Sequence, residues 1–368
     1  MTGPVTAGDG TAQRRGLAAG CTRAPAEVHD VALLDLDGVV YVGPDAVPGV
    51  PEALAVAREV GMRLGFVTNN AARTPEEVAA HLTELGVPAD PADVITSSQA
   101  AASVVAGMLG EGARVLPVGG PGVAEALRAA GLTVVERAED APVAVVQGYG
   151  REVGWAQLAE AVVAVRRGAR HVATNADASI PSPRGPLPGN GAMVGVVRGV
   201  TGIEPLVTGK PDPAMHAECV RRTGALRPLV VGDRLDTDIE GGRRAGAASL
   251  LVLSGVTDPA TLLGAAPQHR PDLLAADAGG LLVAHPAVVE RESGWVCGDW
   301  VVSVGGDGTL QVRTAGGRPD AGEGGEDLDG LRALCVASWS GSADGRPVRV
   351  RAGDEAAARA LADWDLAS

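Results

Sequence analysis

One stretch constrains the fold of this chain more than any other: the apolar run Val31–Leu34, which leads into Asp35, Asp37 and Gly38. The run has the composition of a strand buried on both faces, where an unpaired carboxylate is costly. Acids at the carboxyl end of such a strand lie where open α/β sheets bind ligands. The pattern therefore predicts a site for a hard cation such as Mg²⁺, and the alternative is a strand that ends in an Asp-rich turn.

Strand and helix patterns alternate after this run, which is typical of a parallel α/β sheet. Two further apolar runs also end in polar residues: Met62–Val67 before Thr68-Asn69-Asn70, and Leu229–Val231 before Gly232-Asp233. The carboxyl ends of parallel strands meet at one edge of a sheet, so these side chains are expected to lie near Asp35. We expect an α/β fold with a Rossmann-like parallel sheet at its core.

Composition shifts divide the chain into segments. We expect a flexible leader at 1–27, a core built from 28–89 and 192–286, an inserted α/β unit at 90–191 and a small α+β module at 287–368. The Pro- and Gly-rich stretch 181–191 is a loop by composition and suggests where the inserted unit ends. In the last module, Trp300–Val304 and Leu334–Ser338 have the composition of strands.

Charge and cysteine usage exclude several classes of protein. The net charge of −14 argues against a nucleic-acid partner, whose phosphates require basic surfaces, but it does not exclude a small phosphorylated metabolite. The four cysteines show no metal-site spacing, which indicates reduced thiols in a cytoplasmic protein. No run is apolar enough to cross a membrane. The sequence leaves the oligomeric state open and allows a homodimer.

Rare residue types mark candidate positions. Lys210 is the only lysine, and the asparagines are Asn69, Asn70, Asn175 and Asn190. The heavy use of Ala, Gly and Arg suggests a GC-rich genome that replaces Lys and Asn where it can. The lysine and the asparagines that remain are therefore candidates for positions where another residue type could not perform the same role.

Four loops together supply the groups that phosphoryl transfer requires. A carboxylate attacks phosphorus and forms an aspartyl-phosphate, and a second carboxyl protonates the leaving oxygen and then activates water. A divalent cation, a hydroxyl, an amide and an ammonium stabilise the phosphate oxygens. The loops are Asp35-Leu36-Asp37-Gly38-Val39, Thr68-Asn69-Asn70, Thr208-Gly209-Lys210-Pro211 and Gly232-Asp233-Arg234-Leu235-Asp236-Thr237-Asp238.

These loops resemble the four ordered motifs of the haloacid dehalogenase (HAD) superfamily phosphatases. The insertion between the second and third motifs resembles the cap of the subgroup of 4-nitrophenyl phosphatases, phosphoglycolate phosphatases and bacterial glycerol-3-phosphate phosphatases. The resemblance covers residues 28–286. It implies the following roles: nucleophile, Asp35; general acid/base, Asp37; phosphate binding, Thr68, Asn69 and Lys210; Mg²⁺ ligands, Asp35, Asp233 and the Asp37 backbone carbonyl; support of the metal site, Asp238.

Each of these residues also has a simpler interpretation. Asp238 could cap a helix, Asn70 could hold a turn, and Lys210 could be a bystander on the surface. In the inserted unit, Asn175 and Asp177 are candidates for contacting the leaving group, and turn formation is the alternative. Tyr149 and Trp155 are the only aromatic residues expected in that unit, which disfavours stacking on a nucleobase.

The function expected from the resemblance is Mg²⁺-dependent hydrolysis of a small phosphomonoester, best glycerol 3-phosphate. The alternatives are phosphoglycolate, broad activity on 4-nitrophenyl phosphate or sugar phosphates, a phosphomutase, and an inactive relative that binds phosphometabolites. The tail is weakly similar to GCN5-related acetyltransferases. It lacks their pyrophosphate loop, so we expect a module for interaction or stability rather than acetyl transfer.

Overall fold

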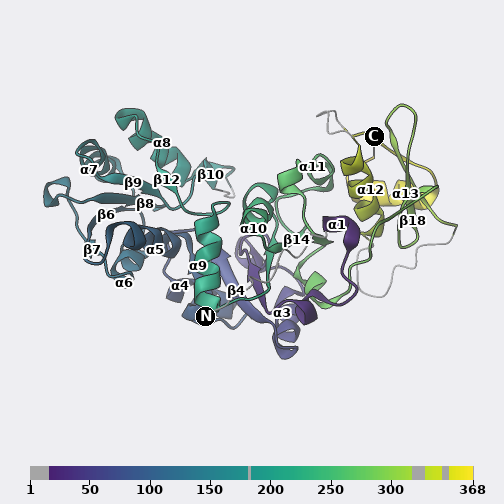
Figure 1. The fold of residues 1–368 in the computed structure, drawn as a ribbon, viewed down its shortest axis with the longest axis horizontal. Helices are drawn as coiled ribbons and strands as arrows, with labels where there is room; N and C mark the ends of the chain where they lie inside the picture. Colours follow the sequence, from purple (N-terminus) through teal and green to yellow (C-terminus); the bar gives the residue numbers. More distant parts are fainter. Residues whose placement is uncertain (1–15, 181–183, 317–327, 342–347, 368) are drawn as a thin grey trace, which may run out of the picture.

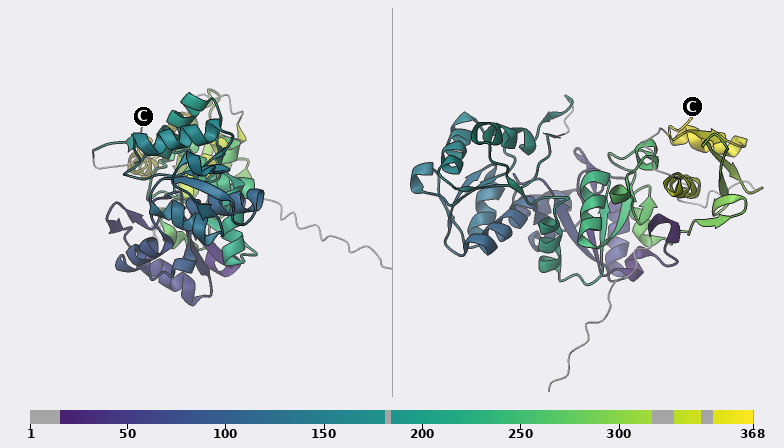
Figure 2. Two further views of the ribbon diagram at one scale, coloured as in Figure 1. Left: turned by 90° about the vertical axis from the view of Figure 1, so that its left-hand side faces the viewer. Right: turned by 45° about the horizontal axis from the view of Figure 1, so that its top comes forward.

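The structure is a computed structural model that describes residues 16–180, 184–316, 328–341 and 348–367. Figures 1 and 2 show three units along the long axis of the molecule, with a parallel sheet in the middle one. The α/β fold expected from the sequence is confirmed. Among the described helices, none combines the length and the apolar character needed to span a bilayer.

The central sheet brings the polar loops together at one edge. Its six strands are all parallel, because each pair along the sheet runs in the same direction. Strand β1 lies between β13 and β4, so the residues that follow these three strands are neighbours. The order is β15 (Leu273–Ala275), β14 (Ala248–Val252), β13 (Pro228–Gly232), β1 (Val31–Leu34), β4 (Arg63–Thr68), β5 (Val94–Thr96).

Helices and short elements surround this sheet. Helix α4 begins with a capping box, in which Thr74 accepts from the Glu77 N–H and Glu77 accepts from the Thr74 N–H. A fully buried cluster that includes Leu34, Phe66 and Leu250 forms one core of the unit. The helices are α2 (Pro25–Val28), α3 (Val50–Glu59), α4 (Pro75–Glu84), α9 (Pro213–Thr223), α10 (Glu240–Ala245) and α11 (Pro259–Leu263), and the two short strands are β2 (Tyr41–Val42) and β3 (Asp45–Ala46).

The inserted unit, which we call the cap, is a second parallel sheet with helices α5 to α8 around it (Figure 1). Helix α5 packs on α6 and also on α9 of the central unit. A two-stranded piece, β10 (Ser179–Ile180) with β11 (Leu187–Pro188), lies next to α8. The elements are β6 (Arg114–Val118), β7 (Thr133–Val134), β8 (Ala144–Gln147), β9 (Arg170–Ala173), β12 (Leu206–Val207), α5 (Ser97–Leu109), α6 (Pro121–Ala129), α7 (Trp155–Arg166) and α8 (Asn190–Thr201).

The expected boundaries of this unit, 90 and 191, are displaced from those in the structure. Strand β5 belongs to the central sheet although it follows residue 90. Strand β12 pairs with β9 of the cap sheet, and α8 packs on α7, so the cap continues to Val207. The Pro- and Gly-rich loop at 181–191 suggested an exit from the unit, but the chain instead returns to add one more helix and strand.

In the residues that the structure describes, the C-terminal module is a five-stranded mixed sheet with two helices. The expected strand Leu334–Ser338 is wrong, because these residues lie in helix α12. When a short run is apolar at nearly every position, its periodicity does not tell a buried strand from a buried helix. The elements are β16 (Val289–Arg291), β17 (Gly294–Cys297), β18 (Trp300–Val304), β19 (Leu310–Thr314), β20 (Val350–Ala352), α12 (Asp329–Ser340) and α13 (Glu355–Asp363).

The segment before the central sheet is not the free leader expected for 1–27. Residues 1–15 lie outside the described ranges, but α1 (Gly16–Ala19) packs on α12. The side chain of Leu17 is buried, and the backbone of Cys21 forms a bridge with His285. One apolar cluster joins Leu17, the core residue Leu274 and residues of the C-terminal module, so these parts share a core.

Candidate active site

The loop after β1 places Asp35 between the ends of the two neighbouring strands. The Asp35 N–H donates to the Val231 carbonyl at 2.8 Å, which continues the pairing of β1 with β13. Gly38 follows with φ +88°, and a Cβ built there would lie 2.5 Å from Asp233 Oδ2. Only glycine both adopts this backbone conformation and allows so close an approach. The loop containing Asp37 therefore closes directly over Asp233.

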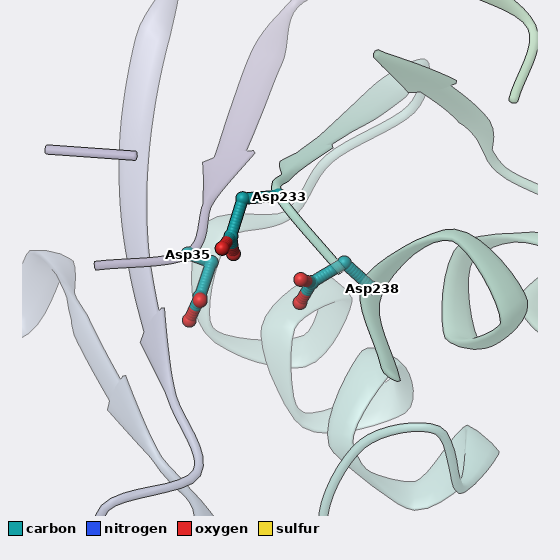
Figure 3. A group of neighbouring side chains, drawn as sticks. All are labelled: Asp35, Asp233 and Asp238. Carbon is teal, nitrogen blue, oxygen red and sulfur yellow. The ribbon is translucent and has the colours of Figure 1, made fainter. Parts of the chain in front are cut away.

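Three carboxylates and one ammonium meet at this sheet edge. Lys210 Nζ donates to Asp35 Oδ1 at 2.6 Å and to Asp238 Oδ1 at 2.7 Å. Asp35, Asp233 and Asp238 each offer one oxygen, and these three oxygens lie within 4.8 Å of one another. Figure 3 shows the three carboxyl groups turned toward a common space. The structure thus brings together residues that are about 200 positions apart in the chain.

Burial raises the free energy of the ionised forms of these groups, and their pKa values shift as a result. Burial, followed by the charges of Asp35 and Asp238, raises the pKa of Asp233 to about 7. Burial also raises the pKa of Asp238 to about 6, although the charge of Lys210 opposes this shift. Burial alone would lower the pKa of Lys210, but the charges of Asp238 and Asp35 outweigh it and raise that pKa above its ordinary value. Three acids and one ammonium leave excess negative charge.

The donor set fits a hard divalent cation. Asp233 is fully buried, and its Oδ2 accepts from the Val256 N–H at 2.7 Å. Its other oxygen, Oδ1, is buried and has no hydrogen-bond donor among the described residues. A buried carboxylate oxygen without a donor is costly, and a cation among carboxylates removes that cost. Asp35, Asp233 and Asp238 are the side chains that would hold such an ion.

Asp238 lies among these carboxylates and does not cap the following helix. The N-cap of α10 is Ile239, which has no capping side chain, so the alternative interpretation of Asp238 is wrong. The Asp238 Oδ2 instead accepts from the Arg234 N–H at 3.2 Å, inside the π-helical turn Leu235–Ile239. This turn directs the carboxylate toward Lys210.

The end of β4 and the loop after it present Thr68 and Asn69 at the same edge. The Asn70 N–H donates to Thr68 Oγ1 at 3.0 Å, and the Asn70 side chain accepts from the Ala72 N–H at 2.9 Å. Asn70 therefore holds the turn, as the simpler interpretation expected. The Asn69 side chain is bonded to the backbone of Lys210, with the Lys210 N–H donating to Asn69 Oδ1 at 2.9 Å.

A pocket of about 530 Å³ opens above these groups, between the central sheet and the cap. Eight of the nine site residues expected from the sequence line it. Burial raises the pKa of Asp37, although the charges of Lys210 and Arg73 oppose the shift. Burial likewise raises the pKa of Asp177. The eight are Asp35, Asp37, Thr68, Asn69, Asn175, Asp177, Lys210 and Asp233, and the ninth, Asp238, lines the smaller adjoining cavity.

The residues of the pocket wall to which the sequence assigned no role include Tyr149, Arg151 and Arg234. Tyr149 is one of two tyrosines in the chain, which is a weak signal that could have marked it. Arg234 was quoted within its motif but received no role. Arg151 carries no signal, because arginine is the common basic residue of this chain and its loop matches no pattern.

Comparison with known proteins agrees with this geometry. A family model described as haloacid dehalogenase-like hydrolase matches residues 32–133, and a HAD-hydrolase-like model matches residues 207–281. The D-glycerol 3-phosphate phosphatase of Mycobacterium tuberculosis is 45% identical over 345 residues, which are 93% of this chain and 95% of that protein. The chain belongs to the haloacid dehalogenase-like hydrolases. The resemblance seen in its four motifs is thereby confirmed.

Solved structures of this hydrolase family extend the agreement to the whole fold. The glycerol phosphate phosphatase of M. tuberculosis in complex with magnesium is 44% identical, with a TM-score of 0.83 over 94% of this chain and 99% of that one. A p-nitrophenyl phosphatase from Archaeoglobus fulgidus is 30% identical, with a TM-score of 0.64 over 69% of this chain and 98% of that one. A GCN5-related N-acetyltransferase-like model matches residues 297–366, in the C-terminal module.

Proposed function

We propose that this hydrolase is a Mg²⁺-dependent phosphatase that hydrolyses D-glycerol 3-phosphate. The observation that carries the proposal is the placement of the Asp35 carboxylate, which lies 2.6 Å from the Lys210 ammonium and faces the pocket beneath the cap. The identity of 45% with a D-glycerol 3-phosphate phosphatase, over nearly the full length of both chains, supports the substrate.

The reaction has two steps, and Asp35 acts as the nucleophile in the first. An Asp35 carboxylate oxygen bonds to phosphorus while the bond from phosphorus to the glycerol oxygen breaks, which gives an aspartyl-phosphate. Asp37 donates its proton to the departing oxygen. Its raised pKa supports this role, because an acid of ordinary pKa would hold no proton near neutral pH.

Water completes the reaction in the second step. Asp37, now ionised, accepts a proton from water as the water oxygen bonds to phosphorus. The bond between phosphorus and the Asp35 oxygen breaks, which regenerates the carboxylate and releases inorganic phosphate. Thr68 and Lys210 hold phosphate oxygens through both steps by hydrogen bonding and charge.

The cation belongs to the proposal as well. Mg²⁺ held by Asp35, Asp233 and Asp238, with the Asp37 carbonyl as a further ligand, would neutralise the repulsion between the carboxylates and the phosphate. The excess of acids over ammonium groups at the site supports this assignment. The magnesium complex of the M. tuberculosis glycerol phosphate phosphatase supports it too.

The pocket favours a small, hydroxylated substrate. Among the described residues that line it, Tyr149 is the only aromatic one, so these residues offer a flat ring one stacking partner at most. Polar side chains such as Asp177 and Ser179 line the cap side of the pocket and suit the hydroxyl groups of a polyol.

A substrate panel tests the proposal. Purified protein is assayed for phosphate release from glycerol 3-phosphate, phosphoglycolate, glucose 6-phosphate, pyridoxal phosphate and AMP, with Mg²⁺ and with EDTA. We expect the highest kcat/KM on glycerol 3-phosphate and no turnover with EDTA. A higher kcat/KM on another substrate would contradict the substrate assignment, and full activity in EDTA would contradict the cation.

Two further expectations belong with this proposal. We expect the protein in the cytoplasm, in keeping with its four free cysteines, three of which are buried. We expect a homodimer, and light scattering coupled to size-exclusion chromatography distinguishes a dimer from a monomer of 36.9 kDa.

A further inference from the structure

Three of the four asparagines form a continuous series of hydrogen bonds from the cap to the Lys210 loop. The Asn190 side chain, at the start of α8, donates to the Asn175 carbonyl at 2.8 Å and to the Gln147 carbonyl at 3.2 Å. The Asn175 side chain donates in turn to the Asn69 carbonyl at 2.7 Å. This last bond crosses from the cap to the central unit.

The series continues through the Asn69 side chain to Lys210. The Lys210 N–H donates to Asn69 Oδ1 at 2.9 Å, and Asn69 Nδ2 donates to the Lys210 carbonyl at 3.2 Å. The amide therefore pairs with both backbone groups of Lys210, as a neighbouring strand would. The ammonium of the same lysine lies against Asp35.

The contact between the two units at this point is tight. Asn175 and Asn190 are 3% and 1% exposed, so water does not compete for their amides. A Cβ at Gly209 would lie 2.2 Å from the Thr174 carbonyl oxygen and 2.7 Å from Asn69 Oδ1. The cap loop and the lysine loop thus touch through backbone with no room for a side chain, and a shift of one displaces the other.

The side-chain amides of these three asparagines already form hydrogen bonds within the protein, and these bonds compete with contact to a substrate. Each of Asn69, Asn175 and Asn190 directs its Nδ2 to a backbone carbonyl, and Asn69 also accepts at Oδ1. Aspartate has the same shape but cannot donate, which gives a physical reason why asparagine persists at these positions in a chain that uses it four times.

We propose that Asn175 and Asn190, acting through Asn69, are positioning residues that set the place of Lys210 relative to Asp35. The cap loop then acts on the reacting carboxylate through this series of bonds rather than through contact with the leaving group. The inference rests on the proposed phosphatase activity for its kinetic test. Its structural half, the coupling of the two loops, is measured without a substrate.

The variant Asn175→Ser separates positioning from leaving-group recognition. Serine remains polar, but its hydroxyl ends one bond short of the amide nitrogen that reaches Asn69. If the residue positions Lys210, kcat for glycerol 3-phosphate and for 4-nitrophenyl phosphate falls by the same factor, on the order of 10–100, with KM little changed. A loss confined to glycerol 3-phosphate, or no loss on either substrate, would overturn the proposal.

Hydrogen–deuterium exchange provides the second readout. In Asn175→Ser, the backbone amides of residues 69–72 and 208–210 exchange faster than in the wild type, although the substitution lies in the cap. Unchanged exchange in both segments would overturn the coupling. If Asn175→Ser does not fold, Asn190→Ser is examined with the same expectations. Asn190 lies one hydrogen bond further from Lys210 in the series.

A matched control completes the design, and the two experiments together distinguish failure of the proposed substrate from failure of the proposed coupling. Gln157→Ser makes the same amide-to-hydroxyl change at an exposed cap residue whose Oε1 accepts from the Gly154 N–H within the cap, so kinetics and exchange remain those of the wild type. If the wild type hydrolyses 4-nitrophenyl phosphate but not glycerol 3-phosphate, the proposed substrate fails. The exchange experiment still decides whether the loops are coupled.

Discussion

The Lys210 ammonium lies 2.6 Å from Asp35 Oδ1, although 175 residues separate the two in the chain. The lysine side chain is 11% exposed and that of the aspartate 14%, so this ion pair is shielded from water on most sides. A second carboxylate, Asp238, lies 2.7 Å away on the other side of the ammonium. The lysine therefore has little freedom to move, and its replacement is expected to be poorly tolerated.

Lys210→Arg is expected to remove most turnover without unfolding the protein. The planar guanidinium is wider than an ammonium and directs its donors in a fixed fork, so it does not fit between two carboxylates that each lie within 2.7 Å of one nitrogen. We expect kcat to fall about 100-fold or more. Steady-state kinetics and thermal melting measure the two properties, and near-normal turnover would show that the lysine is dispensable.

Asp37→Asn is expected to remove acid and base catalysis while leaving the nucleophile in place. Because an amide neither donates an acidic proton nor accepts one from water, we expect kcat to fall by roughly 10²–10⁴. Slow hydrolysis of the intermediate should let phosphate accumulate on Asp35, which mass spectrometry of acid-quenched protein detects. A variant with wild-type kcat would exclude Asp37 from proton transfer.

Stability of the metal-free protein is expected to carry a contribution that falls with rising pH. The pKa of Asp233 is about 7 in the folded protein against 3.8 for an ordinary aspartate, so the folded state holds the proton more tightly. This contribution is complete below pH 3.8 and is lost as the pH rises through about 7. We expect the free energy of unfolding of wild type relative to Asp233→Asn to decrease over this window in EDTA. A constant difference would contradict the raised pKa.

Mg²⁺ binding is expected to release protons over the same pH range. The cation takes ionised carboxylates, so near pH 6 it displaces protons from Asp233 and Asp238, whose pKa values are about 7 and 6. Calorimetric titrations in two buffers of different ionisation enthalpy measure this release. Binding enthalpies that are equal in both buffers would show that no proton leaves.

Leu331→Ala in the C-terminal module is expected to destabilise the whole protein. Leu331 is fully buried in a cluster that also contains Leu251 and Leu274 of the central sheet, so the cavity affects a shared core. We expect a loss of about 2–5 kcal/mol, seen as a lower melting temperature of a single transition. Val304→Ala, at a residue 49% exposed, is the control and should change stability little. A separate early transition would show that the module unfolds alone.

The local features of this protein follow from short stretches of its sequence. The apolar runs that end in Asp35, Thr68 and Asp233 become neighbouring parallel strands, because alternating strand and helix patterns allow few other arrangements. The capping box at Thr74 and the turn held by Asn70 depend on residues two or three positions apart. Such interactions are complete within one loop, so the pattern alone predicts them.

Tertiary structure decided what depends on contacts between distant segments. The run at 334–338 is a helix because it packs against the shared core, and residues 16–28 are held by α12 and His285. The pairing of Asn175 with Asn69 needs two loops 106 positions apart to meet. Residue types by themselves determined the chemistry available at the sheet edge. Which amide meets which carbonyl was decided by packing, because burial selects one arrangement among several that the same residues allow locally.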